Sequence, residues 1–122
     1  MTKLLYYSRT GTTARIMKNF EGAQSIENYN GEGEYILTVP SYCAPRTGQY
    51  VPKPVKQFLA EHYTNMVGVI GVGNSVFGHE FCLGSRRIAE HYHVPTVTEI
   101  DMALTKENIL DIERAVNDKL LS

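Results

Sequence analysis

The sequence predicts an α/β fold in which a doubly wound parallel sheet carries helices on both faces. Short apolar runs typical of strands alternate with segments whose apolar residues recur at helical spacing, from one end of the chain to the other. Such alternation implies right-handed β-α-β crossovers, which place helices on both faces of a parallel sheet. No repeat or linker interrupts the pattern, and 122 residues are too few for two cores. We therefore expect one domain over residues 1–122.

Five segments are expected to form strands. The runs 3–7, 35–39 and 95–100 are rich in apolar and β-branched residues. Residues 66–72 are apolar and spaced by glycines, which is typical of a central parallel strand buried on both faces. A further short run, 23–27, is expected to be an edge strand, followed by a loop rich in Asn and Gly.

Four segments are expected to form helices: 13–20, 52–63, 81–92 and a last helix that begins after Thr105. A proline near the first turn supports the helix over 52–63, and the hydroxyl of Thr105 is a suitable cap for the last helix. Side chains that recur at helical spacing are expected to face the sheet. They are Ala14, Met17 and Phe20; Val55, Phe58, Leu59 and Tyr63; Phe81, Ser85, Ile88, Ala89 and Tyr92; and Ile109, Ile112, Val116 and Leu120.

Composition argues against several classes of function. The chain has 12 basic and 13 acidic residues and a net charge of −1, without the basic stripe that a nucleic-acid backbone requires. No apolar run approaches the roughly 20 residues of a membrane-spanning helix, and no leader with a cleavage site is visible. We therefore expect a cytoplasmic protein that binds neither nucleic acid nor membrane.

The cysteines and histidines do not form a recognisable site. Cys43 and Cys82 lie far apart and belong to no C-x-x-C pair, so we expect two free thiols in a reducing compartment. The four histidines provide no credible set of metal ligands. They are His62, His79, His91 and His93.

Three loops leave the carboxyl ends of the expected strands, where ligands bind in this class of fold. The first, Ser8-Arg9-Thr10-Gly11-Thr12-Thr13, places four hydroxyl side chains around one glycine at the start of a helix. The unpaired N–H groups and the dipole of a helix N-terminus favour a dianionic phosphate. No lysine of the nucleoside-triphosphatase type follows the glycine. The alternative interpretation is an ordinary helix cap rich in hydroxyl groups.

The second and third loops suggest the rest of a ligand site. The second, 40–51, is long for a strand-to-helix connection, which usually takes about two to six residues; it is either the wall of a site or a solvated excursion. The third, 73–80, places Phe77 between two glycines, where its ring either returns to the core or stacks on a planar ligand. A phosphate site, a wall and an aromatic platform together suit flavin mononucleotide (FMN), which is charged at one end and flat and apolar at the other.

These loops resemble those of a known family. The first loop resembles the phosphate loop of flavodoxins, hydroxyl-x-hydroxyl-Gly-x-hydroxyl. Over roughly residues 4–105 the chain is similar to NrdI proteins, the small flavodoxin-like activators of class Ib ribonucleotide reductase. The segments that carry this similarity are Val39-Pro40-Ser41-Tyr42, Thr47-Gly48, Val51-Pro52-Lys53-Pro54-Val55, Phe58-Leu59, Gly68-Val69-Ile70, Gly73-Asn74, Phe77-Gly78 and Val94-Pro95.

The resemblance implies a flavodoxin-like sheet of five parallel strands in the order 2-1-3-4-5, with one bound FMN. The phosphate would lie at 8–13 and the ring between the second and third loops, with Phe77 stacked on the ring and Tyr42 beside it. The residues implied to contact FMN are Ser8, Arg9, Thr10, Gly11, Thr12, Thr13, Ser41, Tyr42, Cys43, Asn74, Phe77 and Gly78. Neither a metal site nor an acid–base catalyst is implied, since the flavin carries the chemistry.

The resemblance also implies a role in assembling the dimanganese–tyrosyl radical cofactor of class Ib ribonucleotide reductase. The protein would supply electrons, or oxygen reduced to superoxide, to the small subunit (NrdF), and would itself be reduced by a flavodoxin reductase or a similar donor. Two alternatives stay open: a generic short-chain flavodoxin that carries electrons, and a flavin-free phosphate-binding or regulatory domain. Generic flavodoxins are strongly acidic, which steers them to basic partners. The near-neutral charge here favours the activator, and residues 35–60 contain no Asp or Glu but include Arg46, Lys53 and Lys56.

Overall fold

The computed structural model describes residues 2–41 and 50–118, with the side chains of Phe77, His79, Glu80 and Asp118 left out. Its centre is a sheet of five strands in the order β2-β1-β3-β4-β5, and every neighbouring pair is parallel. The predicted fold class and strand order are therefore confirmed. The strands are β1 (Lys3–Tyr6), β2 (Gln24–Ser25), β3 (Tyr35–Pro40), β4 (Met66–Gly73) and β5 (Thr96–Asp101).

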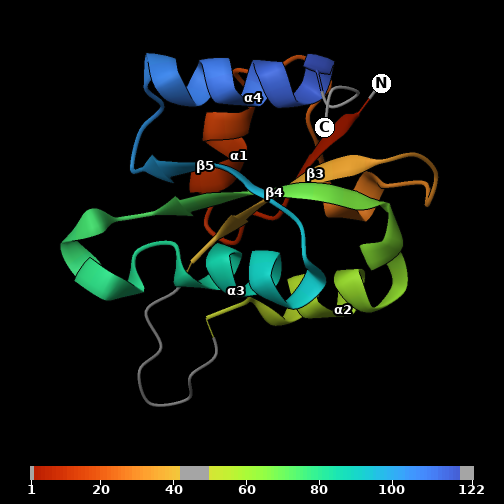
Figure 1. The fold of residues 1–122 in the computed structure, drawn as a ribbon, viewed down its shortest axis with the longest axis horizontal. Coiled ribbons are helices and arrows are strands. Elements are labelled where there is room, and N and C mark those ends of the chain that lie inside the picture. The colour runs from red at the N-terminus through yellow and green to blue at the C-terminus, as the bar shows by residue number, and fades with distance from the viewer. Residues whose placement is uncertain (1, 42–49, 119–122) are drawn as a thin grey trace.

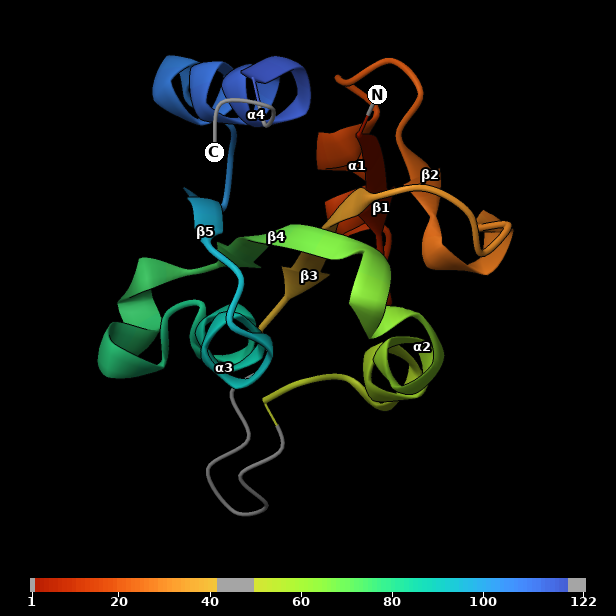
Figure 2. The same cartoon turned by 45° about the vertical axis from the view of Figure 1, so that its right-hand side comes forward.

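Helices cover both faces of this sheet. In Figure 1, α1 (Thr12–Met17) and α4 (Lys106–Asp118) lie above the strands, whereas α2 (Lys53–His62) and α3 (Leu83–Tyr92) lie below them. Figure 2 shows the same three layers from a second direction. Three short 3-10 segments complete the described elements: η1 (Ile26–Asn28), η2 (Tyr63–Asn65) and η3 (Ser75–Glu80).

The sheet separates two hydrophobic clusters, one on each face, because alternate strand residues point to opposite sides. The cluster beneath α2 and α3 holds Leu5, Ile26, Tyr35, Leu37, Val39, Val55, Phe58, Leu59, Met66, Val69 and Ile88. The cluster beneath α1 and α4 holds Leu4, Ile16, Met17, Ile36, Ile70, Val72, Ile100 and Ile112. Strand β4 contributes to both clusters, as its glycine-spaced apolar run predicts.

Three elements differ from the sequence prediction by two or more residues, each for a local reason. Helix α1 ends at Met17, because the next turns tighten: Asn19 N donates to the carbonyl of Ile16 at 3.3 Å. The edge strand β2 keeps only two residues, because the Ser25 hydroxyl accepts from Glu27 N and starts η1. Helix α3 begins at Leu83, because Cys82 adopts a left-handed conformation with φ +52°.

Helix α4 is capped as predicted. The Thr105 hydroxyl accepts from Asn108 N at 3.1 Å, and Asn108 Oδ1 accepts from Thr105 N at 3.1 Å, so each residue satisfies a backbone donor of the other. The amide of Asn108 also donates to Thr98 Oγ1 at 2.8 Å, which ties the start of α4 to β5. Leu120, predicted on the inner stripe of this helix, lies outside the described residues.

An aromatic cluster closes the amino edge of the sheet. The ring centroids of Tyr29, Tyr35, Phe58 and His62 lie 4.9 to 5.7 Å from their neighbours, mostly edge to face. The fully buried Tyr35 hydroxyl donates to the carbonyl of His62 at 2.8 Å. Lys3 Nζ donates to Asn30 Oδ1 at 3.0 Å and holds the 28–34 loop against β1.

Candidate functional site

The carboxyl edge of the sheet brings the three predicted loops together. The first follows β1, the second follows β3 and the third follows β4, and these strands are consecutive neighbours in the sheet. Backbone bonds continue past the strand ends: Tyr7 N donates to the carbonyl of Thr38 and Ser41 N to that of Val72, both at 3.0 Å. The three loops therefore start from a common, hydrogen-bonded edge.

The first loop presents an uncapped helix start. Gly11 precedes α1 with φ +95°, a conformation that glycine adopts without strain. The Ser8 hydroxyl accepts from Gly11 N at 3.1 Å and closes the loop. No side chain in the described part of the chain caps α1, and its first turn contains no acidic residue. These N–H groups therefore fit a bound phosphate, whose oxygens would take the place of a cap.

The predicted phosphate-loop residues do not all have the same exposure. Arg9, Thr10, Gly11 and Thr12 are exposed, and space is open around Gly11, where an added Cβ would meet nothing within 4 Å. Thr13, by contrast, is only 2% exposed. We expect the backbone N–H of Thr13, rather than its hydroxyl, to face an anion at this helix start.

Both described ends of the second loop lie against the start of α3. Gly84 N donates to Ser41 Oγ at 3.1 Å. A Cβ on Gly84 would lie 2.5 Å from the carbonyl oxygen of Tyr50, so only glycine permits this close approach. Sequence reasoning missed Gly84, although a glycine inside the predicted helix was the available signal. Tyr42 and Cys43, predicted beside a ligand, lie outside the described residues, as does Arg46.

The third loop is folded into η3 and anchored from β5. Asn74 Oδ1 accepts from Val76 N at 3.0 Å, which turns the chain, and Gly78 has φ +60°. Asp101, at the end of β5, accepts from Ser75 N at 3.0 Å. The hydroxyl of Ser75, and then this N–H, hold the pKa of Asp101 below its usual value.

Asp101 was missed by sequence reasoning, although a carboxylate directly after the last strand was a usable signal. Phe77 lies in η3, between Val76 and Gly78, but its side chain is outside the described part of the chain. Whether that ring stacks on a ligand stays a prediction.

Cys82 is a structural residue beneath the site. Its thiol is free and its side chain is fully buried. The sulfur packs against Gly73, where an added Cβ would lie 3.2 Å from it. Burial, followed by the field of Glu99, raises the pKa of the thiol to about 12. A buried thiol that stays protonated is a poor nucleophile, so burial and the raised pKa disfavour reaction of Cys82 near neutral pH.

The described residues offer neither a metal cluster nor a membrane segment. Within 2–41 and 50–118, no three His, Cys, Asp or Glu side chains gather as a metal site would require. No helix in these ranges is both long enough and apolar enough to cross a bilayer. His62 belongs to the aromatic cluster, and His91 and His93 are exposed near the end of α3.

The strand order and the three loops at one edge of the sheet define a flavodoxin-like protein. A solved structure described as a short-chain flavodoxin associated with a non-canonical PDU bacterial microcompartment superposes with a TM-score of 0.65, at 14% identity, over 99% of this chain and 98% of the other. The family model described as "NrdI Flavodoxin like" matches residues 4–114. The chain belongs to the NrdI family of flavodoxin-like proteins, and membership implies a bound flavin.

Curated relatives support the same assignment along the full length. Protein NrdI from Bartonella bacilliformis is 32% identical over 124 residues, covering 95% of each chain. Protein NrdI from Cronobacter sakazakii is 29% identical over 127 residues, covering 97% of this chain and 96% of the relative. Protein NrdI from Rhodococcus jostii is 33% identical over 129 residues, covering 93% and 80% respectively.

Proposed function

We propose that residues 1–122 form a single domain that binds one FMN and acts as a redox activator of class Ib ribonucleotide reductase. The protein supplies electrons, or oxygen reduced to superoxide, to the small subunit (NrdF) for assembly of its dimanganese–tyrosyl radical cofactor. The observation that carries this proposal is the match to the NrdI family over residues 4–114. A flavodoxin reductase or a similar donor reduces the protein, and all three act in the cytoplasm.

The donor set of the first loop supports FMN as the flavin. The uncapped N–H groups of α1 and the exposed hydroxyls of Thr10 and Thr12 suit a terminal phosphate dianion. Gly11 lets the backbone approach that phosphate, and Ser8 holds the loop closed. Arg9 and Thr13 complete the loop in the sequence.

The ring of FMN is proposed to lie between the second and third loops. Ser41 is held by Gly84, and Asn74 by its own turn, so both flank this space from anchored positions. Gly78 permits the positive φ that re-aims the chain after Phe77. Tyr42, Cys43 and Phe77 are the proposed ring contacts from sequence.

FMN, when bound, supplies one- and two-electron transfer, including reduction of oxygen to superoxide. The contribution of this chain is to bind the phosphate, orient the ring and set the local charge. Residues 35–60 contain no carboxylate, and Lys53 and Lys56 are exposed on α2. Positive charge near the ring stabilises negatively charged reduced flavin, whereas the acidic surface of a generic flavodoxin opposes it.

Two measurements, made one after the other, test the proposed function. Flavin released by heat from the purified protein should be FMN at one per chain; FAD, or a colourless protein that ignores added FMN, contradicts the cofactor. The reduced holoprotein, mixed with oxygen and manganese-loaded class Ib small subunit, should then generate the tyrosyl radical detected by electron paramagnetic resonance. If FMN is bound but no radical forms, the generic electron carrier replaces the activator.

Substitution of Phe77 by Ala tests the proposed ring contact. The variant should bind FMN more weakly by roughly 1–3 kcal/mol, the range for a base stacked on an aromatic side chain. Its thermal stability should stay near that of the wild type. The opposite pattern, a lower melting temperature with unchanged flavin affinity, would place Phe77 in the core.

A further inference from the structure

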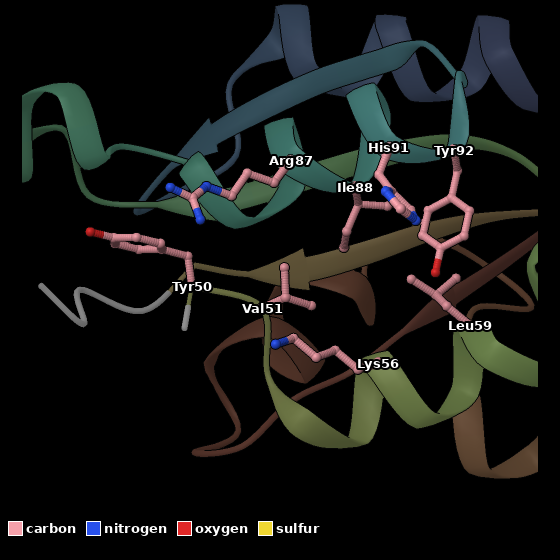
Figure 3. A pocket seen from close by; sticks show the side chains of 8 residues that line it. All are labelled: Tyr50, Val51, Lys56, Leu59, Arg87, Ile88, His91 and Tyr92. Carbon is pink, nitrogen blue, oxygen red and sulfur yellow. The ribbon is translucent and has the colours of Figure 1, made fainter. Parts of the chain in front are cut away.

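We propose that the groove between α2 and α3 is the docking site for an acidic, partly apolar segment of the protein partner. This inference rests on the proposed function, and the partner tested is the class Ib small subunit. The groove has a volume of about 410 Å³. Its lining residues, drawn in Figure 3, are Tyr50, Val51, Lys56, Leu59, Arg87, Ile88, His91 and Tyr92.

The groove has an apolar floor and a polar rim. Leu59 and Ile88 are buried at its base, whereas Lys56, Arg87 and His91 are exposed. Pockets for small molecules usually contain a few buried polar groups that fix the ligand's orientation. Here every charged lining side chain is exposed, which instead matches a protein interface with an apolar centre and a charged rim.

The charge of the groove selects an acidic partner. Its eight lining residues include two permanent cations, Lys56 and Arg87, and no carboxylate. The only carboxylates in α2 and α3 are Glu61 and Glu90, and neither lines the groove. Arg86, next in sequence to Arg87, pairs with Glu99 at 2.7 Å and does not line the groove, whereas Arg87 packs on the Tyr50 ring and brings its charge to the rim. The lining residues therefore carry a net positive charge, which favours Asp or Glu on the partner.

One end of the groove lies at the described end of the second loop, which is proposed to flank the flavin. Tyr50 and Val51 form its end nearest the second loop, and the carbonyl of Tyr50 contacts Gly84 beside Ser41. Figure 3 shows Tyr50 and Arg87 at this end, with Leu59 and Tyr92 at the other. The Arg87 guanidinium carbon lies 4.7 Å from the centroid of the Tyr50 ring. A segment seated here would border the loop proposed to flank the ring, as electron delivery to a partner requires.

A matched pair of charge reversals tests this docking site. The double variant Lys56→Glu with Arg87→Glu reverses the charge of the groove's rim. The control, Lys106→Glu with Arg114→Glu, makes the same charge change on exposed residues of α4, across the sheet. Binding of each FMN-loaded protein to manganese-loaded small subunit is measured by calorimetry, with flavin content and melting temperature as checks on folding. We expect the groove variant to bind at least about tenfold more weakly and the α4 control to stay within about twofold of wild type.

Each outcome decides a separate question. If wild type binds and the groove variant binds equally well, or the α4 control loses as much, the docking site is wrong and the proposed function survives. If the wild-type holoprotein does not bind the small subunit, both the partner and its docking site are wrong. Lys56→Gln with Arg87→Gln should give an intermediate loss and a shallower dependence on salt, because neutralisation removes attraction without adding repulsion.

Discussion

The two edges of the sheet are built in opposite ways. At the amino edge, an aromatic cluster forms from Tyr29, Tyr35, Phe58 and His62. The Tyr35 hydroxyl donates a hydrogen bond to the carbonyl of His62. At the carboxyl edge, Gly11 is left-handed, α1 is uncapped, and the loops expose apolar side chains. Val76 and Met102 are 76% and 60% exposed. Aromatic packing is thus concentrated at one edge, and groups available for binding at the other.

The parallel arrangement of the strands explains this difference. Every strand points the same way, so the helices that follow begin at the carboxyl edge and end at the amino edge. Helix starts present N–H donors and positive dipole ends that favour an anion. The amino edge has no comparable set of donors, so its loops can be closed by aromatic packing and side-chain hydrogen bonds.

Among the substitutions considered, Gly11→Asp is expected to weaken FMN binding at the carboxyl edge most. The substitution adds a negative charge where the phosphate would meet backbone donors, in open space that does not require the core to move. FMN affinity should fall by at least about a hundredfold, about 2.7 kcal/mol, with only a modest fall in melting temperature from the strain of a side chain at φ +95°. Titration of the apoprotein measures this loss.

Gly11→Asn is the matched control for that variant. Asn has nearly the same size as Asp, tolerates positive φ better than most residues and carries no charge. It should retain more FMN affinity than Gly11→Asp. Equal losses of FMN affinity in both variants would mean that backbone conformation, rather than charge, determines the effect. If neither variant lost affinity, the phosphate would bind elsewhere.

Gly84→Ala, at the carboxyl edge, should affect both stability and binding. The new Cβ would lie 2.5 Å from the carbonyl of Tyr50 and 3.2 Å from Ser41 Oγ, so the ends of the second loop must shift. We expect a net loss of about 1–3 kcal/mol in the free energy of unfolding and weaker FMN binding. Ala89→Gly, later in α3, should cost about 1 kcal/mol and leave FMN affinity unchanged. If the two variants bind FMN equally, the second loop does not hold the ring.

Tyr35→Phe should weaken only the amino edge. It removes the hydroxyl that donates to the carbonyl of His62 and leaves the ring packing intact. Loss of this hydrogen bond should lower the free energy of unfolding by about 1 kcal/mol, measured by urea denaturation. FMN affinity should not change; a parallel loss of affinity would show that the two edges are not independent.

A further prediction concerns stability at alkaline pH. Burial raises the pKa of Cys82 from 9.0 to about 12, and it also raises the pKa of Tyr35. The unfolded thiol loses its proton near pH 9 while the folded one keeps it. Its contribution to stability is therefore complete below pH 9 and is lost as the pH rises toward 12. One such group gives a slope of up to about 1.4 kcal/mol per pH unit.

Urea denaturation at pH 7, 9 and 10 measures this slope. Cys82→Ala should be less stable at pH 7 but should lose less stability between pH 9 and 10 than the wild type. Tyr35→Phe should likewise reduce the loss of stability with rising pH. Parallel curves for wild type and Cys82→Ala would mean that burial of the thiol does not control its ionisation in the folded protein.

Periodicity and strand alternation were sufficient to predict a parallel sheet and all four helices, because most elements bury a regular apolar face. The strand order came from the resemblance to flavodoxin-like proteins. Local polar contacts were not predictable to the same degree. The Thr105 cap was recognised from its residue type, but the Asp101 anchor and the Gly84–Tyr50 contact join residues far apart in the chain. The groove between α2 and α3 was missed for the same reason, since its cations come from two helices that meet only after folding.

The central claim is that FMN binds at the carboxyl edge, whereas the aromatic cluster at the amino edge has a structural role. Amide chemical shifts of the 15N-labelled apoprotein, followed as FMN is added, test it most directly. The account predicts saturable shifts at residues 8–13, at Ser41 and at 73–78, with little change at 29–35 and 62–66. Largest shifts at 29–35 and 62–66, or no saturable shift at any residue, would contradict it.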